Sequence, residues 1–233
     1  MKVVILCGGL GSRLSEETKI KPKPMVKIGK YPILVHIMKI YSRFGFNDFV
    51  LALGYKKEVI IDYFKNNQFN NWKITLVDTG KNTLTGNRLL NLKNFLTDEE
   101  NFFLTYGDGL SNINLKKLLA FHKQKNKVAT LTAVRPPARF GELKINKNNT
   151  VRKFQEKNQI NEGWINGGFF VFNKKIFTYL SKKKSMLERE PINKLTKNNQ
   201  LSAFKHFGFW QCMDTLRDKE LLNKIWKLKK NKW

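Results

Sequence analysis

A glycine-rich segment near the N-terminus is the first feature of the sequence with residue types suited to binding phosphate. It reads Gly8-Gly9-Leu10-Gly11-Ser12-Arg13-Leu14 and directly follows the apolar run Val3–Leu6, which is typical of a strand. Glycines have no Cβ atom, so backbone N–H groups can approach phosphate oxygens, while Ser12 and Arg13 add side-chain donors. The spacing matches neither the dinucleotide fingerprint nor a P-loop. Taken alone, the segment fits an ordinary turn equally well.

A second feature follows about ten residues later, where Lys21-Pro22-Lys23-Pro24-Met25 places a lysine between two prolines. Proline fixes its own φ and restricts the preceding residue to extended geometry, so Lys23 is presented by a stiffened backbone. A rigidly held ammonium beside a phosphate loop suits stabilisation of a transferring phosphoryl group. The alternative is a proline-rich connector with incidental lysines.

Two aspartates have positions suited to a metal. Asp108 follows the predicted strand Asn101–Tyr106 between two glycines, and Asp214 precedes the final predicted helix. Magnesium usually takes one or two protein carboxylates together with substrate phosphates, so this pair is sufficient. The alternatives are a turn role for Asp108 in an Asp-Gly pair and an N-cap role for Asp214.

The elements that must position these residues alternate between strand-like and helical runs as far as Val134, which predicts a doubly wound, mostly parallel α/β sheet. The predicted strands there are Val3–Leu6, Phe49–Leu53, Lys73–Val77, Asn101–Tyr106 and Val128–Val134, and the helices are Pro32–Phe44, Glu58–Phe64 and Leu115–Gln124. Antiparallel pieces are then expected at Phe140–Ile145, Val151–Gln155 and Ile165–Phe172, followed by helices at Lys174–Leu180 and Leu187–Lys197, a strand at Leu201–Phe207 and a helix after Asp214. We expect one domain over 1–233, with residues 1–134 mainly binding nucleotide and 135–233 mainly binding sugar phosphate.

Composition narrows the class of protein. The formal charge of +26 invites a nucleic-acid partner, but only eight of the 44 basic residues are arginine and the lysines are scattered among asparagines, which favours a solvated surface. The C-terminal run Lys224–Trp233 is predicted to be a final amphipathic helix. No apolar run is long enough to span a membrane and no signal peptide is recognisable. Cys7 and Cys212 have no disulfide or zinc spacing, so we expect a cytoplasmic protein.

Several separate motifs resemble, in order, those of sugar-1-phosphate nucleotidyltransferases. Besides the two N-terminal segments these are Val77-Asp78-Thr79-Gly80, Thr105-Tyr106-Gly107-Asp108-Gly109, Arg139-Phe140-Gly141, Phe154-Gln155-Glu156-Lys157, Gly163–Phe170, Gly208–Gln211 and Met213-Asp214-Thr215. The resemblance is greatest to members that use CTP and glucose 1-phosphate. It implies a Rossmann-like nucleotidyltransferase fold, an antiparallel sugar-binding region, Mg²⁺, and formation of CDP-glucose and pyrophosphate.

The resemblance also implies roles for individual residues. Lys23 and Arg13 would be catalytic, and Asp108 and Asp214 would bind the metal. The nucleotide would meet Leu6, Gly8, Gly9, Gly11, Ser12, Arg13, Lys23, Thr85, Gly86, Arg88 and Asp108. The sugar phosphate would meet Gly141, Glu156, Lys157, Asn166, Gly167 and Gly168. His36, His122 and His206 form no catalytic set, and none is needed because the attacking phosphate is already ionised.

Three alternatives stay open at this stage. A uridylyl- or thymidylyltransferase would differ only in a few hydrogen bonds to the base, and a basic nucleic-acid-binding protein would keep the scaffold without the chemistry. The chain departs from the family at Gly29-Lys30-Tyr31-Pro32 and is shorter between Phe64 and Trp72. The second departure bears on the expected homo-oligomer contacts.

Overall fold

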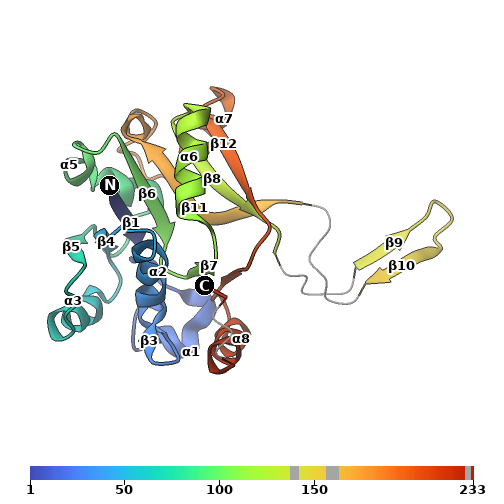
Figure 1. Ribbon diagram of the computed structural model, residues 1–233, viewed down its shortest axis with the longest axis horizontal. Coiled ribbons are helices and arrows are strands. Elements are labelled where there is room, and N and C mark those ends of the chain that lie inside the picture. Colours follow the sequence, from blue (N-terminus) through green and yellow to red (C-terminus); the bar gives the residue numbers. More distant parts are fainter. Residues whose placement is uncertain (137–141, 156–162, 229–231) are drawn as a thin grey trace.

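The computed structural model describes residues 1–136, 142–155, 163–228 and 232–233. Seven strands form a central sheet in the order β12-β8-β11-β6-β1-β4-β5 (Figure 1). Their bounds are Leu201–His206, Ala129–Val134, Ile165–Asn173, Asn101–Tyr106, Lys2–Leu6, Asp48–Leu53 and Lys73–Asp78 in that order. Only β11 runs antiparallel to its two neighbours, β6 and β8. The predicted mostly parallel α/β sheet is therefore confirmed.

Three short antiparallel pairs accompany the sheet. They are β2 Lys27–Ile28 with β3 Tyr31–Pro32, β7 Gly109–Ser111 with β13 Trp210–Cys212, and β9 Glu142–Ile145 with β10 Val151–Gln155. Of these, β9 and β10 lie where the sequence predicts antiparallel pieces. The pair β7–β13 was not predicted, and it joins two segments about a hundred residues apart.

Helices cover both faces of the sheet (Figure 1). The α-helices are α1 Ser15–Thr18, α2 Ile33–Ser42, α3 Lys57–Asn66, α4 Thr85–Leu90, α5 Lys93–Leu96, α6 Leu115–Lys125, α7 Glu190–Lys197 and α8 Leu216–Lys227. The 3₁₀ segments are η1 Ser12–Leu14, η2 Lys23–Met25 and η3 Lys174–Thr178. Among the described residues, no helix has the length and apolar composition needed to cross a bilayer.

The double-sided core follows from the alternation of side chains along β1. Val3 and Ile5 point to the cluster packed against α2, α3, α6 and α8, whereas Val4 and Leu6 point to the cluster packed against α4, α5, η3 and α7. Because both faces are buried, the strand is apolar at every position instead of alternating with polar residues. This arrangement leaves the carboxyl ends of the strands as the open edge of the sheet.

Other elements also differ from the sequence predictions. The run Lys174–Leu180 forms the 3₁₀ segment η3 ending at Thr178, and the C-terminal helix ends at Lys227. Helices α4 and α5 were not predicted, because six and four residues are too few to display a helical period. Beyond α8, Trp233 is 3% exposed and stacks on Trp226, so this part of the basic C-terminal run packs inward.

Candidate active site

The glycine-rich loop that follows β1 presents backbone N–H groups as hydrogen-bond donors. The N–H of Cys7 still bonds to Ala52 O at 2.9 Å, in register with β4. Beyond it, no protein acceptor among the described residues receives the N–H groups of Gly9, Leu10 or Gly11. Free N–H groups on a loop that opens to solvent make a concavity suited to an anion. The loop therefore offers the backbone donors that the predicted phosphate site requires.

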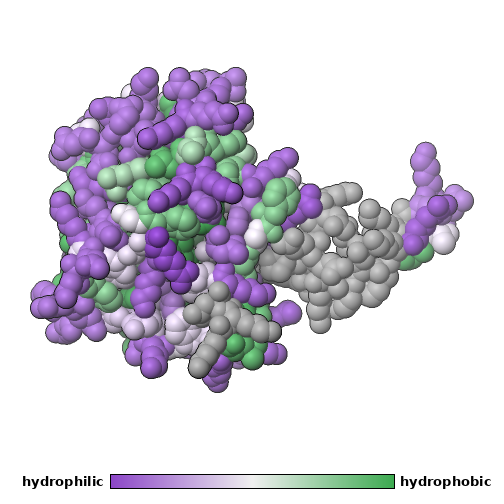
Figure 2. Space-filling view, in the orientation of Figure 1, coloured by the Kyte–Doolittle hydropathy of each residue, from purple (hydrophilic) through white to green (hydrophobic). Residues whose placement is uncertain are grey.

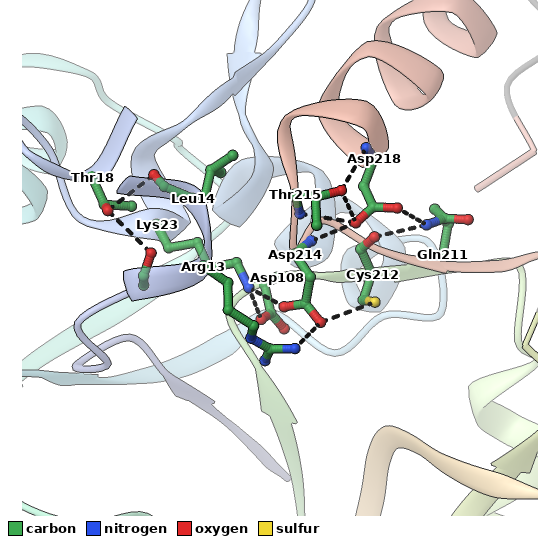
Figure 3. Close-up of polar contacts among 11 residues, drawn as sticks. Arg13, Leu14, Thr18, Lys23, Asp108, Gln211, Cys212, Asp214, Thr215 and Asp218 are labelled. Carbon is green, nitrogen blue, oxygen red and sulfur yellow. Dashed lines mark hydrogen bonds and ion pairs between the residues drawn. The ribbon is translucent and has the colours of Figure 1, made fainter. Parts of the chain in front are cut away.

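The far end of the loop is closed by Thr18. Its hydroxyl donates to the carbonyl oxygens of Gly11 at 3.1 Å and Leu14 at 3.0 Å (Figure 3). Gly11 has φ +67°, and a Cβ atom there would lie 2.8 Å from the methyl carbon of Thr18. Glycine is thus required at position 11 both for its left-handed backbone and for the close contact.

Lys23 reaches the same place from the η2 turn. Pro22 is extended, and the turn is closed by hydrogen bonds from Met25 N to Pro22 O at 2.8 Å and from Val26 N to Lys23 O at 3.1 Å. The residue is only 8% exposed. The backbone of Lys23 is held by its prolines and its turn, but the extended geometry predicted for the residue before Pro24 is wrong, because Lys23 is the first residue of the 3₁₀ segment η2.

Asp108 and Asp214 are brought together by the β7–β13 pair. Gly109 pairs with Cys212 in this ladder, and Met213 N donates to Asp108 O at 2.9 Å. The two carboxylates share one cation, because Lys23 Nζ lies 2.7 Å from Asp108 Oδ2 and 2.5 Å from Asp214 Oδ1 (Figure 3). The other oxygen of Asp214 accepts from Arg13 Nη1 at 2.7 Å. Two acidic and two basic side chains thus form one ion cluster at the loop.

Asp214 is not the N-cap of α8. That position belongs to Thr215, which forms a capping box with Asp218. Asp218 Oδ2 also accepts from the backbone N–H of Asp214 at 3.0 Å, and its Oδ1 accepts from Gln211 Nε2 at 3.1 Å. The helix start therefore fixes the backbone beneath Asp214 and leaves its carboxylate free to face the site.

The cluster shifts the pKa values of its members. Burial raises the pKa of the Asp214 carboxyl, but hydrogen bonding and attraction to Lys23 and Arg13 outweigh this effect and hold the pKa below its usual range. Burial likewise opposes the charge on Lys23, yet the two carboxylates raise the pKa of its ammonium above the usual value. Cys212 is different, because burial and then the nearby Asp214 raise the pKa of its thiol to about 12. It is consequently an unreactive thiol at neutral pH.

The two converging carboxylates suit a divalent metal. The described residues contain no group of three His, Cys, Asp or Glu side chains able to hold an ion without help. Magnesium keeps open positions for water and substrate phosphates, so two carboxylates beside a phosphate loop meet its requirements. The residues present fit such an ion.

A cleft of about 1510 Å³ extends from this cluster across the carboxyl edge of the sheet. Its lining includes the glycine loop, Lys23 and Lys81–Thr85 together with Ile165–Gly168 and Trp210. In parallel sheets ligands bind at this edge. None of the described residues lining the cleft is a histidine.

Arg88 lies under the loop instead of projecting a free charge toward a base. Its guanidinium is 3% exposed and donates to Leu53 O at 2.6 Å, Thr79 Oγ1 at 2.5 Å, Thr83 O at 2.8 Å and Gly8 O at 3.3 Å. It still forms part of the cleft lining. This buried guanidinium donates to four neutral acceptors and so ties the ends of β1, β4 and β5 together.

Thr85 and Gly86 also make internal contacts. Thr85 Oγ1 donates to Glu188 Oε2 at 2.7 Å and accepts from Leu187 N at 2.9 Å, and Gly86 N donates to Ser185 O at 3.1 Å. Thr85 lines the cleft, whereas Gly86 is buried behind it. Their observed contacts dock residues 185–188 onto the start of α4.

The structure describes only some of the residues that are predicted to bind the sugar phosphate. Gly141, Glu156 and Lys157 lie outside the described residues. Asn166, Gly167 and Gly168 line the cleft from β11. Gly168 has φ +78°, and a Cβ atom there would lie 2.6 Å from the Tyr106 ring.

Comparison with known proteins places this cleft in a family. Residues 2–215 match the family described as nucleotidyl transferase. The chain belongs to this family. It is 46% identical over 254 aligned positions to the glucose-1-phosphate cytidylyltransferase of Salmonella typhimurium, covering 100% of this chain and 98% of the relative. It is 43% identical to a probable glucose-1-phosphate cytidylyltransferase of Bacillus subtilis, covering 100% and 99%.

A solved structure agrees with the fold of this nucleotidyl transferase. HddC from Yersinia pseudotuberculosis, complexed with GMP-PN, is 26% identical, with a TM-score of 0.77 over 97% of this chain and 99% of its own. The aligned length with the cytidylyltransferases exceeds the 233 residues of this chain, so these relatives contain residues that it lacks.

Two cleft residues of this family member were missed by sequence reasoning. Tyr106 donates its hydroxyl to Glu188 Oε1, and Asn166 Nδ2 lies 3.4 Å from the same hydroxyl. Glu188 also accepts from Thr85, so hydrogen bonds join Thr85, Glu188, Tyr106 and Asn166, all of which line the cleft. Tyr106 belonged to one of the motifs above, whereas Glu188 lies at the start of the predicted helix Leu187–Lys197 and belongs to no motif.

Proposed function

We propose that this protein transfers CMP from CTP to glucose 1-phosphate, giving CDP-glucose and pyrophosphate. The observation that carries the proposal is the ion cluster of Arg13, Lys23, Asp108 and Asp214 beside a loop with free N–H groups. The full-length similarity to two glucose-1-phosphate cytidylyltransferases supports the choice of base and sugar. A uridylyl- or thymidylyltransferase is not favoured by these relatives.

The proposed reaction needs no general base. A phosphate monoester has its second pKa near 6, so glucose 1-phosphate is largely a dianion at neutral pH. Its phosphate oxygen attacks the α-phosphorus of CTP in line, a new P–O bond forms, and the bond to the β-phosphate oxygen breaks as pyrophosphate leaves. Lys23 and Arg13 neutralise the charge on the transferred and leaving phosphates, while the loop orients them.

We propose Mg²⁺ as the divalent metal that this family generally uses. Asp108 and Asp214 would hold it, and the phosphates of the nucleotide would complete its coordination. When bound, the ion supplies further neutralisation of phosphate charge.

We further infer how the chain divides the substrates. Residues 1–134 would mainly bind the nucleotide, and 135–233 would bind the sugar phosphate through Glu156, Lys157 and Gly141. A cytoplasmic location and a homo-oligomeric state stay predictions, and light scattering of the purified chain tests the second.

The test is product formation by the purified chain with glucose 1-phosphate, Mg²⁺ and CTP, UTP or dTTP in turn. We expect pyrophosphate release and CDP-glucose with CTP, and at least about tenfold lower kcat/KM with the other two. Asp108→Asn should abolish turnover and keep the fold, whereas Asp62→Asn, on an exposed face of α3, should change neither. Equal use of UTP, or full activity of the Asp108 variant, contradicts the proposal.

The nucleic-acid alternative makes a different prediction. It requires tight binding to a labelled duplex with a steep dependence on salt and no dependence on Asp108. Hydrophilic side chains are spread over most of the face in Figure 2 and are interrupted by smaller apolar areas. This distribution agrees with a solvated lysine-rich surface. Salt-sensitive duplex binding without nucleotide turnover would favour the alternative.

A further inference from the structure

The ammonium of Lys23 stands where the proposed metal would have to bind. It lies within 2.7 Å of Asp108 Oδ2 and 2.5 Å of Asp214 Oδ1, so it fills the space between the two carboxylates. A divalent ion coordinated by the same oxygens at about 2.0–2.1 Å cannot share that space with an ammonium. Metal binding therefore requires the lysine to leave.

We propose that Lys23 is the resident cation of the metal site, and that metal and nucleotide together displace it. On this view the lysine moves from the carboxylates to the nucleotide phosphates as the divalent ion takes its place. The proposal rests on the proposed function for the identity of the ligands, but it concerns the order and coupling of their binding.

The packing around the cluster indicates which group moves. The Asp214 backbone is held by Asp218, and its second carboxylate oxygen by Arg13. The Lys23 backbone is held by the η2 turn between its prolines. The part left free to move is the Lys23 side chain beyond Cβ, whose long flexible stem can swing the ammonium from one partner to another.

Charge balance explains why the exchange needs both ligands. Arg13, Lys23, Asp108 and Asp214 sum to zero when all are ionised, and the Lys23 and Asp214 side chains are 10% and 12% exposed. A divalent ion added alone leaves two surplus positive charges and sets the ammonium beside it. A nucleotide added alone draws Lys23 away and leaves the two carboxylates with Arg13 as their one remaining cation in the cluster, so one negative charge is uncompensated. Each ligand removes the penalty of the other, so their binding is positively coupled.

The experiment measures metal binding without nucleotide and without turnover. Mn²⁺ is titrated into the purified full chain, and the free ion is followed by electron paramagnetic resonance. We expect weak binding by the unmodified protein and an affinity about 5- to 150-fold higher for Lys23→Met. Lys23→Arg keeps a cation between the carboxylates and should bind Mn²⁺ as weakly as the unmodified protein. Circular dichroism verifies that each variant is folded, and Lys23→Gln replaces the methionine variant if that one is not.

Two controls separate exchange from a general change of charge. Arg13→Met removes the same charge from a side chain that is 72% exposed and that, among the described residues, has its polar contact with Asp214, so Lys23 stays in place and the gain should be much smaller. Lys21→Met removes a lysine that pairs with Glu17 outside the cleft and should leave Mn²⁺ affinity unchanged.

Either of two results would overturn the proposal that the metal displaces Lys23. One is an equal Mn²⁺ affinity for the Lys23→Met and Arg13→Met variants, and the other is tight Mn²⁺ binding by the unmodified protein. The proposed function fails independently. If Lys23→Met binds Mn²⁺ tightly but the unmodified protein makes no CDP-glucose, the exchange stands and the function is wrong. If CDP-glucose forms while Mn²⁺ affinity is insensitive to Lys23, only the exchange is wrong.

Discussion

Replacing Gly8 by alanine should destabilise the protein, because the guanidinium of Arg88 already fills the space that the new methyl group needs. A Cβ atom at Gly8 would lie 2.1 Å from Arg88 Nη1 and 2.2 Å from its central carbon. Arg88 cannot easily withdraw, since it is 3% exposed and donates to four acceptors. Overpacking of this kind costs about 1–3 kcal/mol.

The double variant Gly8→Ala/Arg88→Ala tests this argument quantitatively. Arg88→Ala alone loses four hydrogen bonds at about 1 kcal/mol each, so we expect a loss of about 3–4 kcal/mol. In Gly8→Ala/Arg88→Ala the methyl group enters the vacated space, and the overpacking cost disappears. The two substitutions should then be less than additive by about 1–3 kcal/mol. Urea unfolding of the four proteins, followed by tryptophan fluorescence, gives the coupling free energy.

Gly9 supplies the matched control. A Cβ atom there meets nothing within 4 Å, so Gly9→Ala should change the free energy of unfolding by less than about 0.5 kcal/mol and be additive with Arg88→Ala. Additivity of the Gly8 and Arg88 substitutions would refute the argument that the two residues compete for one space.

Three further predictions concern residues around the site and the core. Burial lowers the pKa of His122 from 6.5 to about 4, so its neutral form stabilises the fold above pH 6.5. That contribution is lost as pH falls from 6.5 through 4, to a total of about 3 kcal/mol, and urea midpoints measured between pH 7 and 4 should show it. Asp218→Ala should cost about 1–2 kcal/mol by removing the capping box, and it should raise the Mg²⁺ concentration for half-maximal activity because the Asp214 backbone loses its acceptor. Gly168→Ala should cost about 2–4 kcal/mol in a thermal melt, since it combines φ +78° with a contact of 2.6 Å to the Tyr106 ring.

A control variant or a contradicting result can be named for each of these three predictions. His122→Asn should unfold with a flatter pH dependence, and an unchanged slope contradicts the assignment to His122. Thr215→Ala removes the cap but leaves Asp218 on the Asp214 backbone, so a metal requirement raised equally in both variants speaks against positioning by Asp218. A loss below about 1 kcal/mol for Gly168→Ala would mean that β11 and the tyrosine ring relax freely.

The part of the site that the sequence predicts is local along the chain. The loop Gly8–Leu14 and the lysine at position 23 obtain their geometry from neighbouring residues, through glycine, proline and short-range turns. The strands β1, β4 and β6 were likewise predicted within a residue or two, because both of their faces are buried and their sequences are almost uniformly apolar.

The role of Arg88 could not be predicted, although the residue itself was selected. The sequence placed the charge of Arg88 near the expected base site. The four hydrogen-bond acceptors of Arg88, however, lie in segments as much as 80 residues away along the chain. Glu188 was not predicted as a site residue for the same reason, since its hydrogen bond with Tyr106 spans 82 residues and the local pattern around each residue does not reveal the contact.

By itself the sequence determined the α/β class, the phosphate loop, the stiff presentation of Lys23 and the candidate carboxylates, because propensity and periodicity act over a few residues. Only the tertiary structure decided that Asp108 and Asp214 meet and that Lys23 lies between them. These facts depend on the pairing of β7 with β13 across about a hundred residues. Such a pairing is fixed by the packing of the whole sheet, which no short stretch of sequence encodes.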